Sequence, residues 1–526
     1  MKLLNNMTNI MAAALALSSL AACAEKDLYP ETGKDWENIT DFLDSDDDRQ
    51  FLTYYKPYVG TVADPMPFYD AKAGNYKILY LQDYQVNQTG TYHPFWCLET
   101  EDGSSYVSLG EVLPCGNIEE QDAALGTGCA VYDEAEDVYH IYYTGNKHQP
   151  SASENGQVVM RAVSKDFKTW TKDLAFCIKG TDNGYDRNDF RDPCVFKDDD
   201  GKWHMAVTTK KSGTSVLADY VSDDLNEWKW NGDFMTTIWG RFYECPDIFK
   251  MGDWWYLIYS DIESFDRKVH YLKGRTLDEL KACGPDAVWP DSKEGTLDSR
   301  AYYAAKTASD GVSRMIWGWC PVRPGEDNSD VKSGWGGALV CHELRQNDDG
   351  TLVCVAPEAV KASFADSCPV SEKAGEEWSG SNGNYTISDG GYVLFSRLST
   401  RNLITFDVKA EPADKFGFSF CRGGDSEVWY SMVVNPENGN TNRKLNLEQQ
   451  GPKGSGFLDG GDSYVFPNAA DDTYHVTVIT DNSVCVVYIN DVLVYTSRLY
   501  GLARNCWSID SYAGEVSVNN LSIRKY

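Results

Sequence analysis

Five pairs of short segments recur between residues 60 and 320, at a spacing of about 60 residues. In each pair, a segment with a polar or aromatic signature is followed by an aromatic segment with the alternating pattern of a β-strand. Turns rich in Asp, Gly and Asn join the two segments, as β-hairpins require. The pairs begin at Asp64, Thr127, Asp192, Glu244 and Tyr302. A repeat of this length predicts one four-stranded meander per unit, and meanders arranged radially form a β-propeller.

The predicted five-bladed propeller also indicates which distant residues meet. A sandwich of many strands is the alternative, but it does not explain why the signatures recur at one phase. The innermost strands of all blades surround a central channel, so residues at the same phase converge at one end of it. Asp64, Asp192 and Glu244 share this phase. We therefore expect these three carboxylates to surround one site.

The rhythm of the sequence changes after Pro357. From about residue 365 onward, short alternating strands are separated by glycine-rich turns, which is typical of a β-sandwich. The expected fold is therefore all-β, with a five-bladed β-propeller over residues 53–362 and a C-terminal β-sandwich over residues 363–526. Segments 162–170 and 220–228 share an S-x-D-x-x-x-W pattern, which we interpret as further strand signals. No long amphipathic helix is predicted.

The N-terminus has the features of a processing signal. Lys2 supplies a basic residue, and residues 11–20 form an apolar stretch too short to span a bilayer. Residues 20–23, Leu-Ala-Ala-Cys, match a bacterial lipobox, in which the peptidase cuts before the cysteine and the thiol of Cys23 is diacylated. The alternative is an ordinary cleavage site with an incidental cysteine. We expect a lipoprotein signal peptide over residues 1–22 and a tether over residues 23–52.

The charge balance restricts the choice of partners. The chain has 48 Lys and Arg residues against 79 Asp and Glu residues, a formal net charge of −31. Basic side chains supply most of the non-specific affinity for nucleic acid, so DNA and RNA are not expected as partners. An uncharged substrate is more easily accommodated, and a membrane contact is expected only through the lipid on Cys23.

Metal and cofactor chemistry is not expected. The 15 cysteines include no C-x-x-C pair, and the 7 histidines include no H-E-x-x-H motif. Buried thiols behave as small apolar groups, although some of these cysteines can form disulfides in an exported protein. Residues 198–201, Asp-Asp-Asp-Gly, lack the remaining ligand spacing of a calcium loop and predict a hairpin turn.

Carboxylates that converge in an aromatic environment indicate glycoside hydrolysis. In that reaction one carboxylate attacks the sugar or activates water, while a carboxylic acid protonates the leaving oxygen. Aromatic rings stack on sugar faces, which fits the 16 tryptophans of the chain. An Asp before Pro is commonly a turn residue. The recurrence of such residues at one phase favours a shared site instead.

The residues around these acids resemble glycoside hydrolase family 32, the β-fructosidases. Residues 190–196, FRDPCVF, are similar to the R-D-P motif of that family, and residues 243–249, YECPDIF, to its E-C-P motif. Residues 63–70, ADPMPFYD, stand where the family has its first D-P motif. Residues 297–320 are similar to the family's last-blade pattern, and residues 335–352 to the segment that leads to its C-terminal domain. Residues 483–500 are similar to a strand pair of its β-sandwich. The resemblance extends from about residue 55 to the C-terminus.

The resemblance implies a role for each site residue. Asp64 is expected to be the nucleophile that forms a covalent fructosyl-enzyme, and Glu244 the general acid and base. Asp192 is expected to hold the fructose hydroxyls, and Arg191 to orient substrate and keep Asp192 ionised. The remaining expected substrate contacts are His93, Thr127, Tyr303 and Trp319. The implied mechanism is retaining, with the two reacting carboxyls about 5–5.5 Å apart.

The chain departs from the family around Asp64. The usual run is W-M-N-D-P-N-G, whereas residues 61–67 are Thr-Val-Ala-Asp-Pro-Met-Pro, and Leu81 stands where a glutamine is common. The acid is kept, but its polar surroundings are rebuilt. His93 aligns with a W-G-H segment, and a structural histidine is the alternative interpretation of it.

Two other functions fit part of the sequence. Glycoside hydrolase family 43, which includes inverting arabinanases and xylosidases, also begins with an A-D-P-like segment, and its carboxyls are expected about 6.5–9.5 Å apart. A surface lipoprotein that binds glycans without catalysis is the second alternative. The first expectation is a β-fructosidase acting on fructan or fructo-oligosaccharide. It would be lipid-anchored to the cell envelope of a Gram-negative bacterium, and no oligomeric state is predicted.

Overall fold

The computed structural model describes residues 52–57, 60–83, 92–237, 241–261, 268–286, 294–322, 335–422, 429–436, 442–450, 456–457, 463–467 and 471–526. The expected signal peptide, Cys23 and all of the expected tether except Leu52 lie outside the described residues. No helix within the described ranges is long and apolar enough to cross a membrane.

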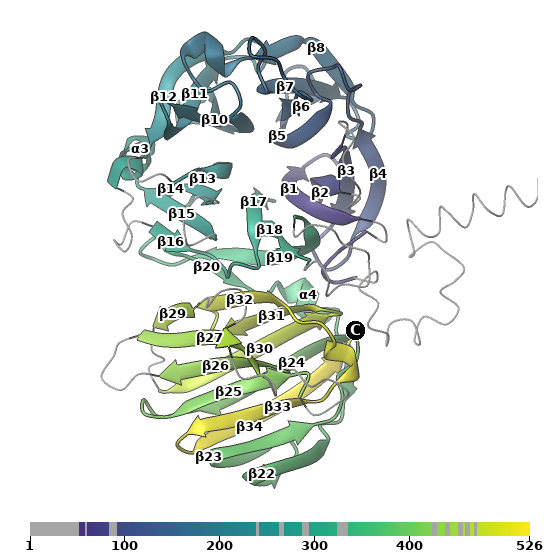
Figure 1. The fold of residues 1–526 in the computed structure, drawn as a ribbon, viewed down its shortest axis with the longest axis vertical. Helices are drawn as coiled ribbons and strands as arrows, with labels where there is room; N and C mark the ends of the chain where they lie inside the picture. Colours follow the sequence, from purple (N-terminus) through teal and green to yellow (C-terminus); the bar gives the residue numbers. More distant parts are fainter. Residues whose placement is uncertain are drawn as a thin grey trace, which may run out of the picture.

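The first half of the chain forms five antiparallel blades around an axis (Figure 1). Blade I contains β1 (Thr61–Asp70), β2 (Asn75–Asp83), β3 (Phe95–Thr100) and β4 (Val107–Leu113). Blade II contains β5 (Ala124–Asp133), β6 (Val138–Asn146), β7 (Gln157–Ser164) and β8 (Thr171–Ile178). Blade III contains β9 (Phe190–Lys197), β10 (Trp203–Lys211), β11 (Thr214–Ser222) and β12 (Lys229–Thr236). Blade IV contains β13 (Glu244–Met251), β14 (Trp254–Ser260), β15 (Val269–Gly274) and β16 (Glu294–Thr296). Blade V contains β17 (Tyr303–Ser309), β18 (Arg314–Pro321), β19 (Gly337–Gln346) and β20 (Leu352–Val355).

The predicted five-bladed propeller is confirmed. Each sequence pair forms the first two strands of a blade, and the inner strands β1, β5, β9, β13 and β17 contact one another in turn around the axis. The ring closes where β1 of blade I pairs with β19 of blade V, at Val62 and Gly337. The inner strands β5, β9, β13 and β17 each end their own sheet at the axis, so the ring surrounds the axis with one strand from every blade.

The C-terminal domain forms the predicted β-sandwich, with a core that includes Phe406, Phe418 and Trp507. Neighbouring strands are hydrogen-bonded in the order β28-β27-β26-β25-β33-β23-β34-β24-β30-β31-β32. The short helix α4 (Glu358–Ala362) lies between blade V and this domain. The strands are β21 (Asp366–Cys368), β22 (Glu372–Ser381), β23 (Asn384–Phe395), β24 (Arg401–Lys409), β25 (Lys415–Phe420), β26 (Trp429–Pro436), β27 (Asn442–Gln450), β28 (Gly456–Phe457), β29 (Ser463–Pro467), β30 (Thr473–Asp481), β31 (Val484–Ile489), β32 (Leu493–Arg498), β33 (Trp507–Ala513) and β34 (Val516–Lys525).

The two domains share a buried interface. Strand β31 is apolar on both faces: Cys485 and Val487 belong to the sandwich core, whereas Val486 and Tyr488 pack with residues of blades IV and V. Alternate side chains of a strand point to opposite faces, so an unbroken apolar run fits a strand covered on both sides. The Arg498 guanidinium donates to the carbonyls of Pro321 and Cys320 at 2.7 and 3.1 Å, which ties the sandwich to blade V.

The S-x-D-x-x-x-W segments are turns, so their interpretation as strands is wrong beyond their first residues. Strand β7 ends at Ser164, and the Asp166 carboxylate then accepts hydrogen bonds from the backbone N–H groups of residues 168 and 169. Asp224 makes the equivalent bonds after β11, with residues 226 and 227. An Asp side chain that satisfies the backbone two residues on favours a turn over a strand.

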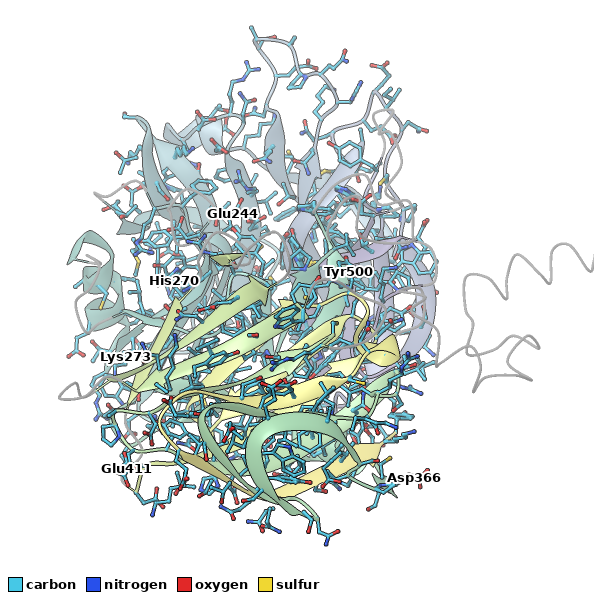
Figure 2. All side chains as sticks on the ribbon, turned by 60° about the horizontal axis from the view of Figure 1, so that its bottom comes forward. Glu244, His270, Lys273, Asp366, Glu411 and Tyr500 are labelled. Atoms are coloured by element: carbon cyan, nitrogen blue, oxygen red, sulfur yellow. The ribbon has the colours of Figure 1, made fainter. Side chains whose placement is uncertain are left out.

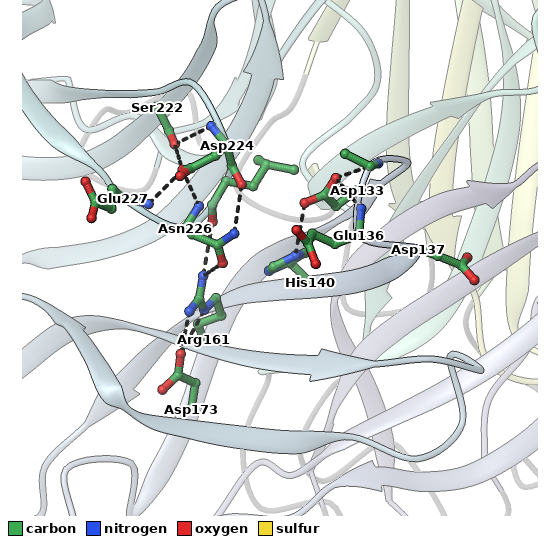
Figure 3. A network of polar contacts seen from close by, with 12 residues as sticks. Asp133, Glu136, Asp137, His140, Arg161, Asp173, Ser222, Asp224, Asn226 and Glu227 are labelled. Atoms are coloured by element: carbon green, nitrogen blue, oxygen red, sulfur yellow. Dashed lines mark hydrogen bonds and ion pairs between the residues drawn. The ribbon is translucent and has the colours of Figure 1, made fainter.

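Blades II and III are joined by a polar network on the outside of the propeller (Figure 3). The Arg161 Nη1 atom of β7 donates to the Leu225 carbonyl and the Asn226 side chain at 3.1 and 2.9 Å, while its Nε atom donates to Asp173. Nearby lies a surface cavity of about 660 Å³. It is lined by residues 132–136 of the β5–β6 hairpin, by Asp223, Asp224 and Asn226 of the turn after β11, and by Lys197 and Trp203. Its acidic residues Asp133 and Asp224 cap backbone N–H groups of their own turns.

One helix was not predicted from the sequence. Helix α3 (Leu277–Asp286) connects β15 to β16 and packs Leu280 and Cys283 into a core shared with β14. The Thr276 hydroxyl accepts the Glu279 N–H at 3.1 Å, and the Glu279 carboxylate accepts the Arg275 N–H. The T-x-x-E pattern at 276–279 is the usual signature of such a helix start, and it was the signal available in the sequence.

Candidate active site

Each inner strand has a β-bulge at the same level. The register shifts after Ala63 in β1, at Thr127 in β5, after Arg191 in β9, after Glu244 in β13 and after Tyr303 in β17. In four of the five strands, the first bulged residue has a left-handed backbone: φ is 45° at Asp64, 56° at Asp192, 49° at Cys245 and 51° at Ala304. Such conformations are unusual outside glycine and cluster at functional sites.

The bulges correct the predicted phase of Glu244. Asp64 and Asp192 occupy the left-handed position, but in blade IV this position belongs to Cys245. Glu244 precedes it and is therefore equivalent to Arg191 and Tyr303, not to the two aspartates. The sequence alone did not reveal this one-residue offset, because the extra residue of a bulge interrupts the alternation that a regular strand has.

Asp64 is partly exposed and is held through both of its carboxylate oxygens. The Thr127 hydroxyl donates to Oδ2 at 2.6 Å, and the Trp319 indole N–H donates to Oδ1 at 3.1 Å. Burial raises the pKa of Asp64, and the charge of Glu244 raises it further, whereas these two hydrogen bonds lower it. Thr127 and Trp319 were expected to contact substrate. Both are buried, and in the free protein they orient Asp64.

Asp192 is buried, and its Oδ2 atom faces blade IV. Its Oδ2 atom accepts the Cys245 N–H at 3.0 Å, and the Arg191 Nε atom lies 3.8 Å from it. Burial raises the pKa of Asp192 to about 7, although the Arg191 charge and the Cys245 N–H both lower it. Arg191 thus acts in the expected direction, but it does not outweigh the loss of hydration that burial imposes.

Glu244 is partly exposed and binds one partner through each oxygen. The Arg191 Nη2 atom donates to Oε1 at 2.8 Å, and the Tyr303 hydroxyl donates to Oε2 at 2.8 Å. The Arg191 guanidinium also donates to Asp189 at 2.7 Å and lies over the Phe242 ring. Tyr303, which was expected to contact substrate, is buried behind Glu244. Figure 2 shows Glu244 among the propeller strands, away from Asp366 and Glu411 on the sandwich.

His93 lies in an aromatic group that reaches the site. Its ring stacks on Trp335 with centroids 4.3 Å apart, and Trp335 lies 6.3 Å from Trp319, which binds Asp64. Burial lowers the pKa of His93 to about 3, so its ring is neutral at neutral pH. The sequence analysis included Trp335 only in the segment 335–352 and did not predict its contact with His93.

The sequence analysis also missed the hydroxyl groups that support the bulges. Thr144 Oγ1 accepts the Asp192 N–H and donates to the Thr127 carbonyl, both at 2.9 Å. Ser260 Oγ accepts the Ala304 N–H at 3.0 Å, and Thr208 Oγ1 donates to the Tyr243 carbonyl. The signal in the sequence that could have predicted these hydroxyl groups is a Ser or Thr near the end of the second segment of each pair, in YYTG, AVTT and LIYS.

The described residues contain no group of three or more His, Cys, Asp or Glu side chains able to hold a metal ion. The 14 cysteines after Cys23 are all free thiols in the structure. The 198–201 segment forms the predicted hairpin turn between β9 and β10, in which the Asp198 carboxylate accepts the Asp200 and Lys202 N–H groups. The site consists of carboxylates, one guanidinium, and hydroxyl and indole donors, which are suited to acid–base chemistry on a polyol.

Comparison with protein families agrees with this fold and site. A family model described as the N-terminal domain of glycosyl hydrolases family 32 matches residues 54–357. A second, described as the GH32, BT1760-like, C-terminal domain, matches residues 350–523. The chain therefore belongs to glycoside hydrolase family 32. The alternative assignment to family 43 is not supported by these matches.

Known relatives cover parts of the chain. An invertase of Debaryomyces hansenii is 26% identical over 235 residues, which are 40% of this chain and 41% of the relative. A sucrose-6-phosphate hydrolase of Escherichia coli is 28% identical over 175 residues, 31% of this chain and 35% of the relative. These matches thus span less than half the length of each relative.

Solved structures share the whole fold. The fructan 1-exohydrolase IIa of Cichorium intybus has a TM-score of 0.72 and 15% identity, covering 91% of this chain and 97% of that chain. A GH32 β-fructofuranosidase of Bombyx mori has a TM-score of 0.67 and 17% identity, covering 94% and 98%. Variants of these two proteins have been solved with 1-kestose and with sucrose, respectively.

Proposed function

We propose that this protein is a retaining β-fructosidase that hydrolyses fructans or sucrose-type oligosaccharides. The observation that carries the proposal is the proximity of two partly exposed carboxylates, Asp64 and Glu244. The Thr127 hydroxyl that donates to Asp64 lies 3.8 Å from the Sγ atom of Cys245, the residue after Glu244. The two carboxylates come from strands 180 residues apart within a family 32 propeller. The similarity to an invertase in sequence and to a fructan 1-exohydrolase in fold supports a fructosyl substrate.

The proposed reaction has two steps with balanced proton transfer. An Asp64 oxygen attacks the anomeric carbon of the fructosyl unit, and the bond to the leaving oxygen breaks as Glu244 gives that oxygen its proton. Glu244 then removes a proton from water, which attacks the same carbon and releases Asp64 as a carboxylate. The hydrogen bonds from Thr127 and Trp319 fix the Asp64 oxygens before the attack, which reduces the reorganisation the reaction requires.

Asp192 and Arg191 are proposed to bind rather than to react. Asp192 would accept hydrogen bonds from fructose hydroxyls that strengthen as positive charge develops on the ring. Arg191 holds Glu244 and neighbours Asp192, so it fixes the two carboxylates relative to each other. Met66 follows Asp64 by two residues on β1, Leu81 pairs with Ala63 from β2, and both are buried in an apolar cluster that includes Trp319. We infer that this apolar wall gives a preference of linkage or chain length different from that of relatives with a polar wall.

Product analysis on sucrose, levan, inulin and arabinan tests the proposal. Release of fructose is the expected result. Glu244→Gln should lower kcat by about 10²–10⁴-fold, because it removes the proton donor while keeping the size and the hydrogen-bonding atoms of the side chain. Glu343→Gln, on an outer strand of blade V, is the matched control and should leave kcat unchanged. Release of arabinose without fructose, or full activity of Glu244→Gln, would contradict the proposal.

The covalent step is tested separately. Rapid-quench mass spectrometry of Glu244→Gln with an aryl fructoside, whose leaving group needs no protonation, should detect a fructosyl ester on the peptide that contains Asp64. The glycan-binding alternative predicts sugar binding by the native protein without turnover. If the native protein binds fructan but forms neither fructose nor this ester, the glycan-binding alternative is correct.

We propose further that the protein is a lipoprotein of the cell envelope of a Gram-negative bacterium, anchored through Cys23. The lipobox supports this proposal, and the anchor would hold the enzyme where exported or extracellular glycans are met. Metabolic labelling with an alkynyl fatty acid should label the protein, and Cys23→Ala should abolish the label. Labelling that survives Cys23→Ala would contradict this anchor.

A further inference from the structure

Lys306 places a buried positive charge on the propeller axis. It lies on β17, directly after the bulge at Ala304, and its side chain is almost completely buried. Its Nζ atom donates to the Gly128 carbonyl of β5 at 2.8 Å. Strands β17 and β5 are the two neighbours of β1 in the ring, so the Lys306 side chain reaches past β1 from one neighbour to the other. A buried ammonium in such a position requires a compensating charge.

Most groups that face Lys306 are uncharged. The thiols of Cys129, Cys194 and Cys245 face it from β5, β9 and β13. Burial raises the pKa of each of these thiols, that of Cys129 to about 11, so all three are neutral at neutral pH. The sulfur atoms of Cys129 and Cys194 also accept the N–H groups of Val195 and Ile248 on the following strands, at 3.2 and 3.3 Å.

Two carboxylates lie near Lys306, and one of them has a second cation close by. Asp247 of β13 accepts hydrogen bonds from the Thr307 N–H and hydroxyl at 2.8 and 2.6 Å. The Arg314 guanidinium donates to the same Thr307 hydroxyl at 2.7 Å and adds a positive charge near Asp247. The second carboxylate is Asp64 of β1. Its Oδ2 atom accepts the hydroxyl of Thr127, which directly precedes the Gly128 whose carbonyl accepts the Lys306 ammonium, and the Lys306 charge lowers the pKa of Asp64.

Asp64 otherwise has an environment that disfavours its charged form. Glu244 and the neutral Cys245 thiol face it from β13, and Asp192 faces it from β9. Thr127 and Trp319 donate hydrogen bonds but carry no charge. Among the described residues that most influence the ionisation of Asp64, Lys306 is the one that carries a positive charge. A nucleophilic carboxylate has to be deprotonated before it attacks.

We propose that Lys306 is a positioning residue whose buried ammonium keeps the Asp64 carboxyl ionised in the free enzyme. It does this from below the site, without touching substrate. The ammonium is fixed by the Gly128 carbonyl, so the charge is present before substrate arrives and costs no reorganisation during the reaction. The kinetic consequence rests on the proposed function, whereas the ionisation of Asp64 can be measured without any turnover.

The kinetic test compares variants that separate charge from hydrogen bonding. Lys306→Gln keeps an N–H donor and removes the charge, Lys306→Met removes both, and Lys306→Arg keeps the charge. We expect the acidic limb of the kcat/KM profile to move up by about one pH unit or more in the Gln and Met variants. It should stay in place in Lys306→Arg. Lys77→Met is the matched control, because Lys77 is equally buried and pairs with Glu99, away from the axis.

A second measurement is independent of activity. Protein labelled with ¹³C at the aspartate carboxyl carbon gives the titration of Asp64, identified as the signal lost in Asp64→Asn. The Asp64 midpoint should rise in Lys306→Gln and be unchanged in Lys77→Met. An unchanged midpoint in folded Lys306→Gln would overturn the proposal even if fructose is released. If no sugar is hydrolysed but the midpoint rises, the proposed function fails and the role of Lys306 in ionising Asp64 stands.

Discussion

Asp192 combines a strained backbone with a costly charge. Its φ of 56° is maintained by the Thr144 hydroxyl, which accepts its N–H, and its carboxylate is buried between two blades. The unfolded chain would ionise this group near its ordinary pKa of 3.8, whereas burial raises the pKa to about 7 in the folded protein. The strained backbone and the buried carboxylate of Asp192 therefore lower the stability of the folded protein, as is common where function requires an unusual environment.

This cost gives a pH-dependent prediction. Between about pH 4 and pH 7 the folded protein holds a proton on Asp192 that the unfolded chain has released, so the stabilisation from this proton is lost as pH rises through 7. Asp192→Asn cannot ionise. Its stability relative to the native protein should rise between pH 4 and 8 by on the order of 1–3 kcal/mol, measured by urea unfolding.

The control for this prediction is Asp253→Asn, because the Asp253 side chain is 90% exposed in a hairpin. Subtracting its stability difference, measured over the same pH range, isolates the change that comes from the burial of Asp192. A difference for Asp192→Asn that is constant over the same pH range would show that Asp192 titrates normally in the folded protein.

At the scale of the elements, the blades depend on polar links at their outer edges. Arg161 of β7 bonds within blade II through Asp173 and across to blade III through the Leu225 carbonyl and Asn226 (Figure 3). Its guanidinium is 12% exposed, and it also lies over the Phe176 ring. A guanidinium that bonds to a carbonyl and two side chains at once contributes more stability than a surface ion pair, because its loss leaves several groups without partners.

We therefore predict that Arg161→Ala lowers the free energy of unfolding by about 1–3 kcal/mol, measured by urea unfolding. Arg345→Ala is the control: its partner Glu343 lies on the same strand, its side chain is 44% exposed, and exposed pairs contribute about 0–1 kcal/mol. Equal effects of the two substitutions would mean that the link between blades II and III adds no stability.

At the scale of the whole molecule, the sandwich braces the side of the propeller opposite blades II and III (Figure 1). Asp298 is fully buried at the interface and accepts the Thr496 N–H at 2.8 Å and a hydrogen bond from its hydroxyl at 2.5 Å. His342 of blade V lies 3.1 Å from Asp298 and 2.8 Å from the Tyr488 hydroxyl of the sandwich. Blade V also provides Tyr303 and Trp319 to the site, so the interface supports the strands that hold Glu244 and Asp64.

This arrangement predicts that the two domains unfold together. Calorimetry of the native protein should give one transition. Asp298→Ala leaves the Thr496 and His342 groups without their partner in the interior, so it should separate the transition into two or lower its midpoint by several degrees. Glu358→Ala on α4, whose side chain is 73% exposed, is the control and should leave the single transition unchanged. Two transitions in the native protein would contradict the coupling.

The sequence determined the blades and the convergence of the carboxylates. The five aromatic pairs, the two D-P segments and the E-C-P segment are local patterns, and a closed ring brings equal phases together whatever the details of packing. The unbroken apolar run of β31 is likewise a local pattern, and it fits the burial of both faces of this strand. These features depend on periodicity and turn chemistry, which short stretches of sequence encode.

Only the tertiary structure decided how the site is built. The one-residue offset of Glu244 follows from a bulge whose position depends on the neighbouring strand. Thr144 supports Asp192 from 48 residues away, Lys306 reaches Gly128 across 178 residues, and Trp319 binds Asp64 across 255. Such contacts leave no periodic trace in the sequence, because each depends on where the closed ring places two unrelated segments in space.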